Sequence, residues 1–390
     1  MEFELWWLLA LPLAFGLGWL ASRLDLRQWR RDGTVRRGAS LSYFRGLNFL
    51  LSEQQDKAID AFIEAVTADP DTVDLHFALG NLFRRRGEYE RAVRVHQNLL
   101  ARGDLPAAER QRAQIALAQD FFKAGLLDRA ESVYVALTST PYRPEALAAL
   151  LQIHERTREW NRAIDIAGEL ERLGSGSYSR QVAHYWCEIA TRARERGDLP
   201  AAREALEQAS RSHAGAVRPW LLRAAIAQHE GDAAAALADL RHIARIAPDF
   251  TALAALDIAR LAQSLGQQEE VSAWLRDQLR DDPAIDVLDA ALLLEPDSQQ
   301  RYALALAYLQ TQHTLLAARR LLDQSPPLPH GDAARPALQQ TLDGALRSRQ
   351  RYRCAGCGFE ARNYTWHCPA CQGWDTYPPR RTEELHILNP

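Results

Sequence analysis

The chain has 390 residues, of which 47% are hydrophobic, and its formal net charge is −3 at pH 7. This length and this apolar content are sufficient for two or three folded domains. The nearly balanced charge excludes a general electrostatic attraction to nucleic acid.

An uncharged apolar segment lies close to the N-terminus. Residues Leu5 to Ser22 carry no charged side chain over 18 positions, and a helix of that length extends about 27 Å, close to the hydrocarbon thickness of a bilayer. Three tryptophans lie near its two ends, where indole rings favour the membrane interface. A cleaved signal peptide is the alternative, but its first residues would be basic, whereas two glutamates precede this segment. We therefore predict a transmembrane helix within residues 1–22.

Arginines follow the apolar segment immediately. No basic residue precedes the segment, whereas six arginines lie in residues 23–38: Arg23, Arg27, Arg30, Arg31, Arg36 and Arg37. Positively charged residues beside a membrane span favour the cytoplasmic side. The sequence thus predicts a single-pass protein with its N-terminus outside the cytoplasm, a basic juxtamembrane segment, and a cytoplasmic remainder.

A pattern of about 34 residues recurs from residue 39 to about residue 285. Its small or β-branched marker positions are separated by 34, 38, 33, 39, 34 and 35 residues: Ala58, Ala92, Ala130, Ala163, Ala202, Ala236 and Val271. This spacing is the tetratricopeptide pattern, in which each unit is a pair of helices. Each unit buries its apolar face only by stacking on its neighbours. We therefore predict an all-α fold, with a tetratricopeptide superhelix over residues 39–324 that has a concave face.

Finer features of the array also follow from the pattern. Glycines at equivalent positions of the first two units, Gly46 and Gly80, should let the two helices of a unit approach closely. The two longest steps predict longer helices or loops, for instance around residues 104–106 and 174–176. Residues 301–323 are predicted to be helical. Residues 325–350, which begin with a proline-rich stretch, are predicted to be a linker with a connecting helix.

No motif in the array indicates catalysis. The GxSxG, P-loop, HExxH and GxGxxG patterns are all missing from the sequence. The histidines show no pairwise metal spacing and are expected on helix faces or in the core. The run Arg84–Arg86 is expected to be a solvated helix end rather than a nucleic-acid patch. Cys187 is expected to be a buried, inert thiol. We predict that the protein is not an enzyme and has no small-molecule substrate.

The remaining four cysteines form two matched pairs near the C-terminus. Cys354 and Cys357 are two residues apart, ten residues follow, and Cys368 and Cys371 repeat the spacing. Two such knuckles supply the four sulfurs of a tetrahedral metal site. Gly358 after the first pair can take a positive φ and turn backbone N–H groups toward the sulfurs. Two disulfides are the alternative, but a chain facing a reducing compartment favours metal.

The knuckles predict a small metal-stabilised module over residues 351–390. About forty residues cannot build much core, so the metal and the surrounding aromatic side chains should supply its stability. One S₄-bound ion is expected, zinc in preference to iron because zinc is redox-silent. His367 could replace a ligand. Nearby arginines are placed to compensate the negative charge of the thiolates: Arg351, Arg353, Arg362, Arg380 and Arg381.

A membrane helix, a tetratricopeptide array and a four-cysteine module, in this order, resemble the lipopolysaccharide assembly protein B family. Residues 46–58 and 79–87 look like the first and second repeats of that family. Residues 351–354 and 364–371 look like its rubredoxin-type tail. The resemblance covers essentially the whole chain and is weakest over residues 250–340.

The resemblance implies an inner-membrane regulator of lipopolysaccharide synthesis in a Gram-negative bacterium, with a periplasmic N-terminus. Such a protein is an adaptor that helps the membrane-bound protease FtsH degrade the deacetylase LpxC, and the membrane protein YejM (PbgA) restrains it. The metal module would pack against the array as a rigid end. A general membrane-tethered scaffold and a rubredoxin-like electron carrier are the alternatives.

Overall fold

The computed structural model describes the following residues of the chain: 14–17, 19, 42–69, 71–326, 334–347 and 351–388. The predicted transmembrane helix and basic segment, residues 1–38, lie outside this set except for five positions. Within the described part of the chain, no helix is both long and apolar enough to cross a membrane.

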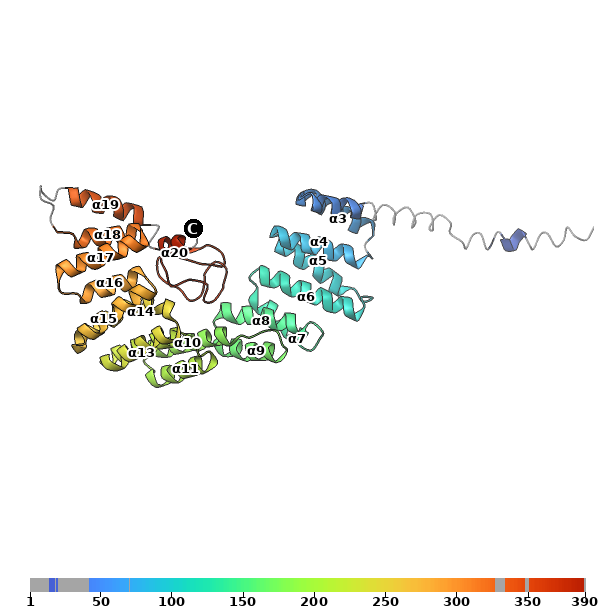
Figure 1. Ribbon diagram of the computed structural model, residues 1–390. Coiled ribbons are helices and arrows are strands. Elements are labelled where there is room, and N and C mark those ends of the chain that lie inside the picture. The colour runs from blue at the N-terminus through green and yellow to red at the C-terminus, as the bar shows by residue number, and fades with distance from the viewer. Residues whose placement is uncertain are drawn as a thin grey trace, which may run out of the picture. The chain divides into compact units, whose positions relative to one another are not determined.

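The chain folds into two compact units, each built from stacked pairs of helices (Figure 1). The first unit holds the described residues up to Glu159 and Arg172–Ser175, and the second holds Trp160–Glu171 and the residues from Gly176 on. The first unit begins with a helix over residues 42–51 and continues with α3 (Gln55–Ala68), α4 (Val73–Arg86), α5 (Tyr89–Ala101), α6 (Ala107–Lys123), α7 (Leu127–Leu137) and α8 (Arg143–Thr157). The repeat helices of the second unit are α9 (Trp160–Arg172), α10 (Ser179–Glu195), α11 (Leu199–Ser212), α12 (Arg218–His229), α13 (Ala233–Ile246), α14 (Thr251–Leu265), α15 (Gln268–Asp281), α16 (Ile285–Leu294), α17 (Ser298–Gln312) and α18 (Leu315–Gln324), with a short 3₁₀ helix, η1 (Pro248–Phe250), before α14.

The marker residues of the repeat pattern lie at the centres of these helix pairs. Each is in the second helix of its pair, from Ala58 in α3 to Val271 in α15, and all seven have an exposed fraction of 0%. A larger side chain at such a position would separate the two helices, because interiors are packed without free space. This burial confirms the predicted repeat.

The close approach predicted at Gly46 and Gly80 is also present. A Cβ on Gly46 would lie 2.7 Å from the Phe62 ring, and a Cβ on Gly80 would lie 2.5 Å from the ring of His96 in α5. His96 has no exposed surface, and its Nδ1 lies 2.5 Å from a carboxylate oxygen of Asp120 in α6. The histidine therefore cannot move aside, and only glycine fits at position 80.

The sequence predicted that the arginine run at the end of α4 is a solvated face. The structure shows that this is not true of the whole run. The side chain of Arg84 is only 18% exposed, and its Nη1 lies 2.8 Å from a carboxylate oxygen of Asp120. The same nitrogen donates a hydrogen bond to the Ala116 carbonyl at 3.1 Å. The prediction was wrong for Arg84 because the next repeat carries a buried acid that local sequence does not reveal.

The long steps of the repeat have the predicted causes. Helices α6 and α10 each have 17 residues, whereas α7 has 11 residues. The loops before these two long helices cover residues 102–106 and 173–178. A longer helix therefore contributes to both long steps. A longer loop contributes only to the second, because the loop over residues 102–106 is no longer than the loops over residues 138–142 and 213–217.

The prediction of one helix over residues 301–323 was wrong, because the chain forms two helices there. Helix α17 ends at Gln312, and the next residue, His313, has a left-handed φ of +46°. The hydroxyl of Thr314 then caps α18 by accepting a hydrogen bond from the Ala317 N–H at 3.0 Å. Helix α19 (Ala334–Leu346) follows, and its last residue, Leu346, is buried against Tyr308 and Leu316.

The C-terminal module adds the only strands of the described residues. Strands β1 (Tyr352–Arg353) and β2 (Glu360–Ala361) pair antiparallel, with Tyr352 opposite Ala361. The module ends in helix α20 (Thr382–Leu388). The fold is thus helical throughout the array and mixed only in this module.

We expect the substitution Gly80→Ala to destabilise the first unit by about 1–3 kcal/mol, because the added methyl group must displace a buried ring. The matched control is Gly168→Ala in α9, where a Cβ would meet nothing within 4 Å. It should be neutral or stabilise by roughly 0.4–1 kcal/mol. Urea unfolding monitored by circular dichroism measures both, and equal stabilities of the two variants would contradict the packing argument.

Candidate metal centre

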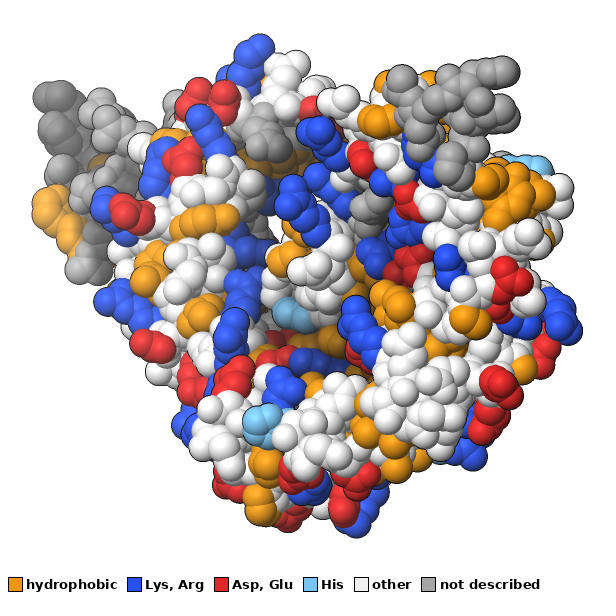
Figure 2. All heavy atoms as spheres, turned by 90° about the vertical axis from the view of Figure 1, so that its left-hand side faces the viewer, with side chains coloured by type: hydrophobic (Ala, Val, Ile, Leu, Met, Phe, Trp, Pro, Cys, Tyr) orange, Lys and Arg blue, Asp and Glu red, His pale blue; other side chains and the backbone are white. Residues whose placement is uncertain are grey.

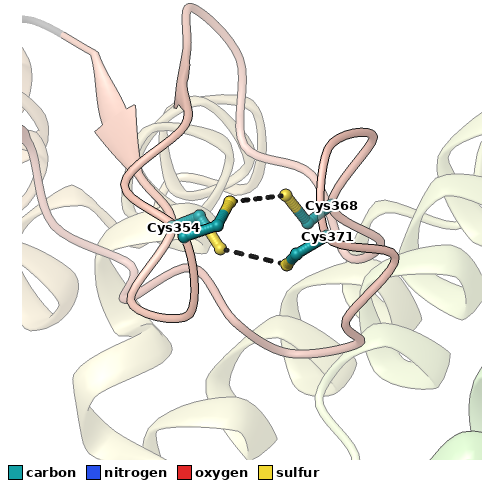
Figure 3. A group of neighbouring side chains, drawn as sticks. Cys354, Cys368 and Cys371 are labelled. Atoms are coloured by element: carbon teal, nitrogen blue, oxygen red, sulfur yellow. Dashed lines mark hydrogen bonds between the residues drawn. The ribbon is translucent and has the colours of Figure 1, made fainter. Parts of the chain in front are cut away.

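Two backbone turns of nearly identical geometry carry the four cysteines. The Cys354 N–H donates to the Phe359 carbonyl and the Cys368 N–H to the Gly373 carbonyl, both at 2.9 Å. Figure 3 shows the sulfurs of Cys354, Cys368 and Cys371 pointing toward one another from two facing loops. The structure therefore brings together all four side chains that the sequence predicts as ligands.

A residue with positive φ closes each turn. Gly358, with φ +78°, follows the first pair as predicted, and Gln372, with φ +60°, takes the equivalent place after the second. Each donates its N–H to the carbonyl of the first cysteine of its turn, at 2.9 Å. The sequence did not reveal this role of Gln372, because glutamine rarely adopts a left-handed conformation.

The spacing of the sulfurs fits a tetrahedral ion. The Cys354 Sγ lies 3.7 Å from the Cys371 Sγ, and the Cys357 Sγ lies 3.7 Å from the Cys368 Sγ. All four sulfurs lie within 4.8 Å of one another. Metal–sulfur bonds of about 2.3 Å in a tetrahedron place the sulfurs roughly 3.8 Å apart, whereas a disulfide would need about 2.05 Å. The four cysteines can therefore hold one metal ion, and they are not disulfide-bonded.

The pKa values of the four thiols are shifted in opposite directions. Burial acts to raise the pKa of the Cys354 thiol, but hydrogen bonds from Thr376 and from two backbone N–H groups outweigh it and lower the pKa to about 6. At Cys371 a hydrogen bond from the Gly373 N–H acts to lower the pKa, but desolvation and the neighbouring sulfurs outweigh it and raise the pKa to about 12. Four thiolates so close together repel one another, and a bound cation removes that repulsion.

Four sulfur ligands complete a tetrahedron and leave no position for a substrate. Zinc and iron both accept this geometry, and the sulfur positions do not distinguish them. His367 is not among the grouped ligands. Its Nε2 lies 3.0 Å from the Gln372 carbonyl oxygen, and its ring stacks on Trp374 at 4.3 Å.

The module packs on the repeat array through its second knuckle. The Trp374 ring stacks on His184 of α10 at 4.9 Å and meets the edge of Trp160 of α9 at 6.2 Å. The neighbouring Asp375 places a carboxylate oxygen 2.8 Å from the Nε2 of His184. Trp366 stacks on Phe250 of η1 at 5.9 Å. The aromatic residues expected to stabilise the module alone thus bind it to the array.

The segment after the knuckles provides a second attachment. The Glu383 carboxylate accepts hydrogen bonds from the N–H groups of Leu315 and Leu316 at the start of α18, at 2.8 and 3.0 Å. The Glu384 carboxylate accepts one from the Ile285 N–H at the start of α16, at 2.8 Å. A carboxylate at a helix N-terminus satisfies unpaired N–H groups and favours the helix dipole. Burial nevertheless raises the pKa of Glu384.

The sequence predicted that five nearby arginines compensate the negative charge of the thiolates. Not all of them do so, because some pair with carboxylates instead. Arg381 forms two hydrogen bonds to Asp286 of α16, at 2.8 and 3.1 Å. Arg380 pairs with Asp282, and Arg351 lies 4.0 Å from Glu360. The prediction was wrong for Arg380 and Arg381 because acids of the array pair with them, and for Arg351 because Glu360 of β2 lies beside it.

Cys187 is buried, with an exposed fraction of 0%. Burial raises the pKa of its thiol to about 12. The predicted burial is thus confirmed, and the raised pKa disfavours the thiolate, which is the reactive form.

We expect the double variant Cys354→Ser, Cys357→Ser to lose the bound metal and the fold of residues 351–388, because half of the ligands are gone. Metal analysis and hydrogen exchange by mass spectrometry measure the two effects. The control, Cys187→Ala, should keep about one metal ion per chain. A double variant that retains metal and protection would refute the ligand assignment.

The substitution Glu383→Ala should loosen the module by about 1–3 kcal/mol, because two N–H groups at the start of α18 lose their partner. Hydrogen exchange should rise in residues 351–388 and at the start of α18. The exposed Glu204 of α11 offers the control Glu204→Ala, which should change neither region. Unchanged exchange in the Glu383 variant would show that the contact has no stabilising role.

Comparison with known proteins agrees with this geometry. Residues 352–379 match the family described as a rubredoxin metal binding domain, and residues 45–104 and 187–249 match the tetratricopeptide repeat. Lipopolysaccharide assembly protein B of Escherichia coli strain K12 is 34% identical over 380 residues, covering 96% of this chain and 97% of that protein. The protein of the same name from Haemophilus influenzae is 29% identical over 391 residues, covering 96% and 98%. The chain therefore belongs to the lipopolysaccharide assembly protein B family.

Proposed function

We propose that this protein is a non-enzymatic adaptor that regulates lipopolysaccharide synthesis by promoting degradation of the deacetylase LpxC by the protease FtsH. The observation that carries the proposal is the similarity to lipopolysaccharide assembly protein B over 96% of the chain and 97% of the relative. Similarity over that extent includes the repeats and the metal module together. The similarity supports a role in lipopolysaccharide assembly. That the protein acts by promoting proteolysis of LpxC is our proposal.

The described structure supports an adaptor in two ways. A stack of repeats offers an extended surface for protein partners. The sulfur cluster has no position for a substrate, which suits a structural metal rather than a catalytic one. In this proposal the metal holds residues 351–388 in the form that packs on the array, and YejM (PbgA) restrains the adaptor.

The adaptor would act at the inner membrane. The apolar residues 5–22 and the arginines of residues 23–38 support a single span with a periplasmic N-terminus. A shared membrane raises the effective concentration of a protease and its adaptor without a large contact area. Deletion of residues 1–22 should move the protein from the membrane to the soluble fraction and impair regulation, and full regulation without them would refute the tether.

An electron carrier is the second candidate, favoured by the exposure of Cys357 and Cys371. Exposed ligands of a redox-active iron would let electrons pass to a partner. This function requires bound iron with a reversible redox transition. Metal analysis decides the matter, because a colourless protein loaded with zinc cannot carry electrons in this way.

The half-life of LpxC in depleted cells tests the adaptor directly. We expect LpxC to persist after depletion, and its half-life to shorten when the full chain is restored. Restoration with the Cys354→Ser, Cys357→Ser variant should fail, whereas Cys187→Ala should restore degradation. An LpxC half-life that does not respond to the full chain would reduce the protein to a scaffold with other partners.

A further inference from the structure

The four cysteines of the metal centre are not equally accessible. Cys354 and Cys368, the first cysteines of the two turns, are 2% and 0% exposed. Cys357 and Cys371, the second cysteines, are both exposed. Each turn therefore presents one cysteine to solvent and buries the other. A reagent that approaches from solvent meets Cys357 or Cys371 first.

The hydrogen bonds to the sulfurs follow the same division. The Cys354 sulfur accepts hydrogen bonds from one hydroxyl and two backbone N–H groups, and so does the Cys368 sulfur. The sulfurs of Cys357 and Cys371 each accept a single backbone hydrogen bond. Hydrogen bonds stabilise a thiolate and make it a weaker nucleophile. The two exposed cysteines are thus also the more nucleophilic ones.

The tips of the two turns are uncharged. Only Ala355 and Gly356 lie between the cysteines of the first pair, and only Pro369 and Ala370 between those of the second. All four are exposed. Another face of the second unit is different, because Figure 2 shows acidic and basic side chains interspersed on the side where α15 and α17 lie in Figure 1. Small neutral residues at the tips leave the exposed cysteines open to a small neutral reagent.

Each exposed cysteine has a buried cysteine of the opposite turn as its partner. The Sγ atoms of Cys371 and Cys354 are 3.7 Å apart, and so are those of Cys357 and Cys368. Figure 3 shows these two contacts as dashed lines between the facing loops. A disulfide bond would require each pair to approach by about 1.7 Å. These contacts join cysteines across the two turns and not within either Cys-x2-Cys motif.

The attachment of the module to the array does not use the cysteines. Trp366, Trp374 and Asp375 contact the array beside the second turn, and Glu383 and Glu384 contact the starts of α18 and α16. A covalent bond between the turns holds them together, as a bound ion does. Cross-links across the turns can therefore replace the ion without releasing the module from the array.

We propose that the four cysteines are a site of reversible oxidative modification. Hydrogen peroxide joins Cys354 to Cys371 and Cys357 to Cys368, the ion is released, and the module stays bound to the array. The centre then holds metal only while its surroundings are reducing. This proposal does not depend on the adaptor function proposed above.

The reaction takes two steps for each pair of cysteines. The exposed thiolate of Cys371 attacks peroxide, so that a sulfur–oxygen bond forms, the oxygen–oxygen bond breaks and hydroxide leaves. The Cys354 thiolate then attacks the resulting sulfenic acid, the disulfide forms and a second hydroxide leaves. The two sulfurs together lose the two electrons that reduce the peroxide. A second peroxide molecule joins Cys357 to Cys368 in the same way, and no thiolate is left to hold the ion.

The experiment uses the purified full chain loaded with zinc. Hydrogen peroxide is added in small steps, zinc release is followed with a chromogenic chelator, and the product is digested with trypsin without reduction. Arg362 lies between the two pairs of cysteines, so trypsin separates the pairs into two peptides unless a disulfide joins them. Cys187 of the same chain is the matched control, because it is completely buried and should remain a free thiol.

We expect the loss of about one zinc ion per chain and two tryptic peptides joined by disulfides between Cys354 and Cys371 and between Cys357 and Cys368. Dithiothreitol with zinc should restore the original state. Hydrogen exchange at the Leu315 and Leu316 N–H groups should stay slow, in contrast to the Cys354→Ser, Cys357→Ser variant.

Three results would overturn the proposal. The first is zinc that stays bound when peroxide is in excess. The second is a pair of separate peptides, oxidised within each turn or to sulfinic acid. The third is fast exchange at the start of α18 after oxidation, because it would show that the cross-linked module had left the array.

Discussion

The helix pairs that the structure describes share their cores with neighbouring pairs, and the structure depends on that constraint. Marker residues such as Ala92 and Ala236 are completely buried, because the two helices of a pair meet there and the neighbouring pair covers them. The space between the two helices of a pair is so small that a Cβ at position 80 would overlap the His96 ring. Stability is therefore a property of neighbouring repeats together rather than of any single repeat.

The C-terminal module obeys the same constraint. Its two short strands and its knuckles bury little apolar surface, so it relies on a metal and on the array. Trp374 and Trp366 pack outward onto α9, α10 and η1, and Glu383 satisfies two N–H groups at the start of α18. Metal binding and the attachment of the module to the last repeats are thereby linked. The cysteines and Glu383 belong to the same short stretch of the chain, residues 351–388.

Two surfaces of the second unit differ in chemistry. The surface bound by the module is aromatic and charged, and it is already filled by the chain itself. A cavity lined by the ends of α14 and α16 has an aliphatic and polar wall, in which Arg276 is paired with Glu295.

The sequence by itself determined the repeat, the close glycines and the four converging cysteines, because spacing along a helix or a knuckle fixes which residues face one point. It did not reveal the burial of Arg84, the break at His313, the left-handed Gln372 or the acids that take Arg380 and Arg381. The burial of Arg84 and the pairing of Arg380 and Arg381 depend on acids distant in sequence, such as Asp120 and Asp286. The left-handed residues Gln372 and His313 are local, but neither residue type favours that conformation. Only the tertiary structure decided them, because a side chain's environment is set by whichever repeat or module packs against it, and local pattern carries no record of that neighbour.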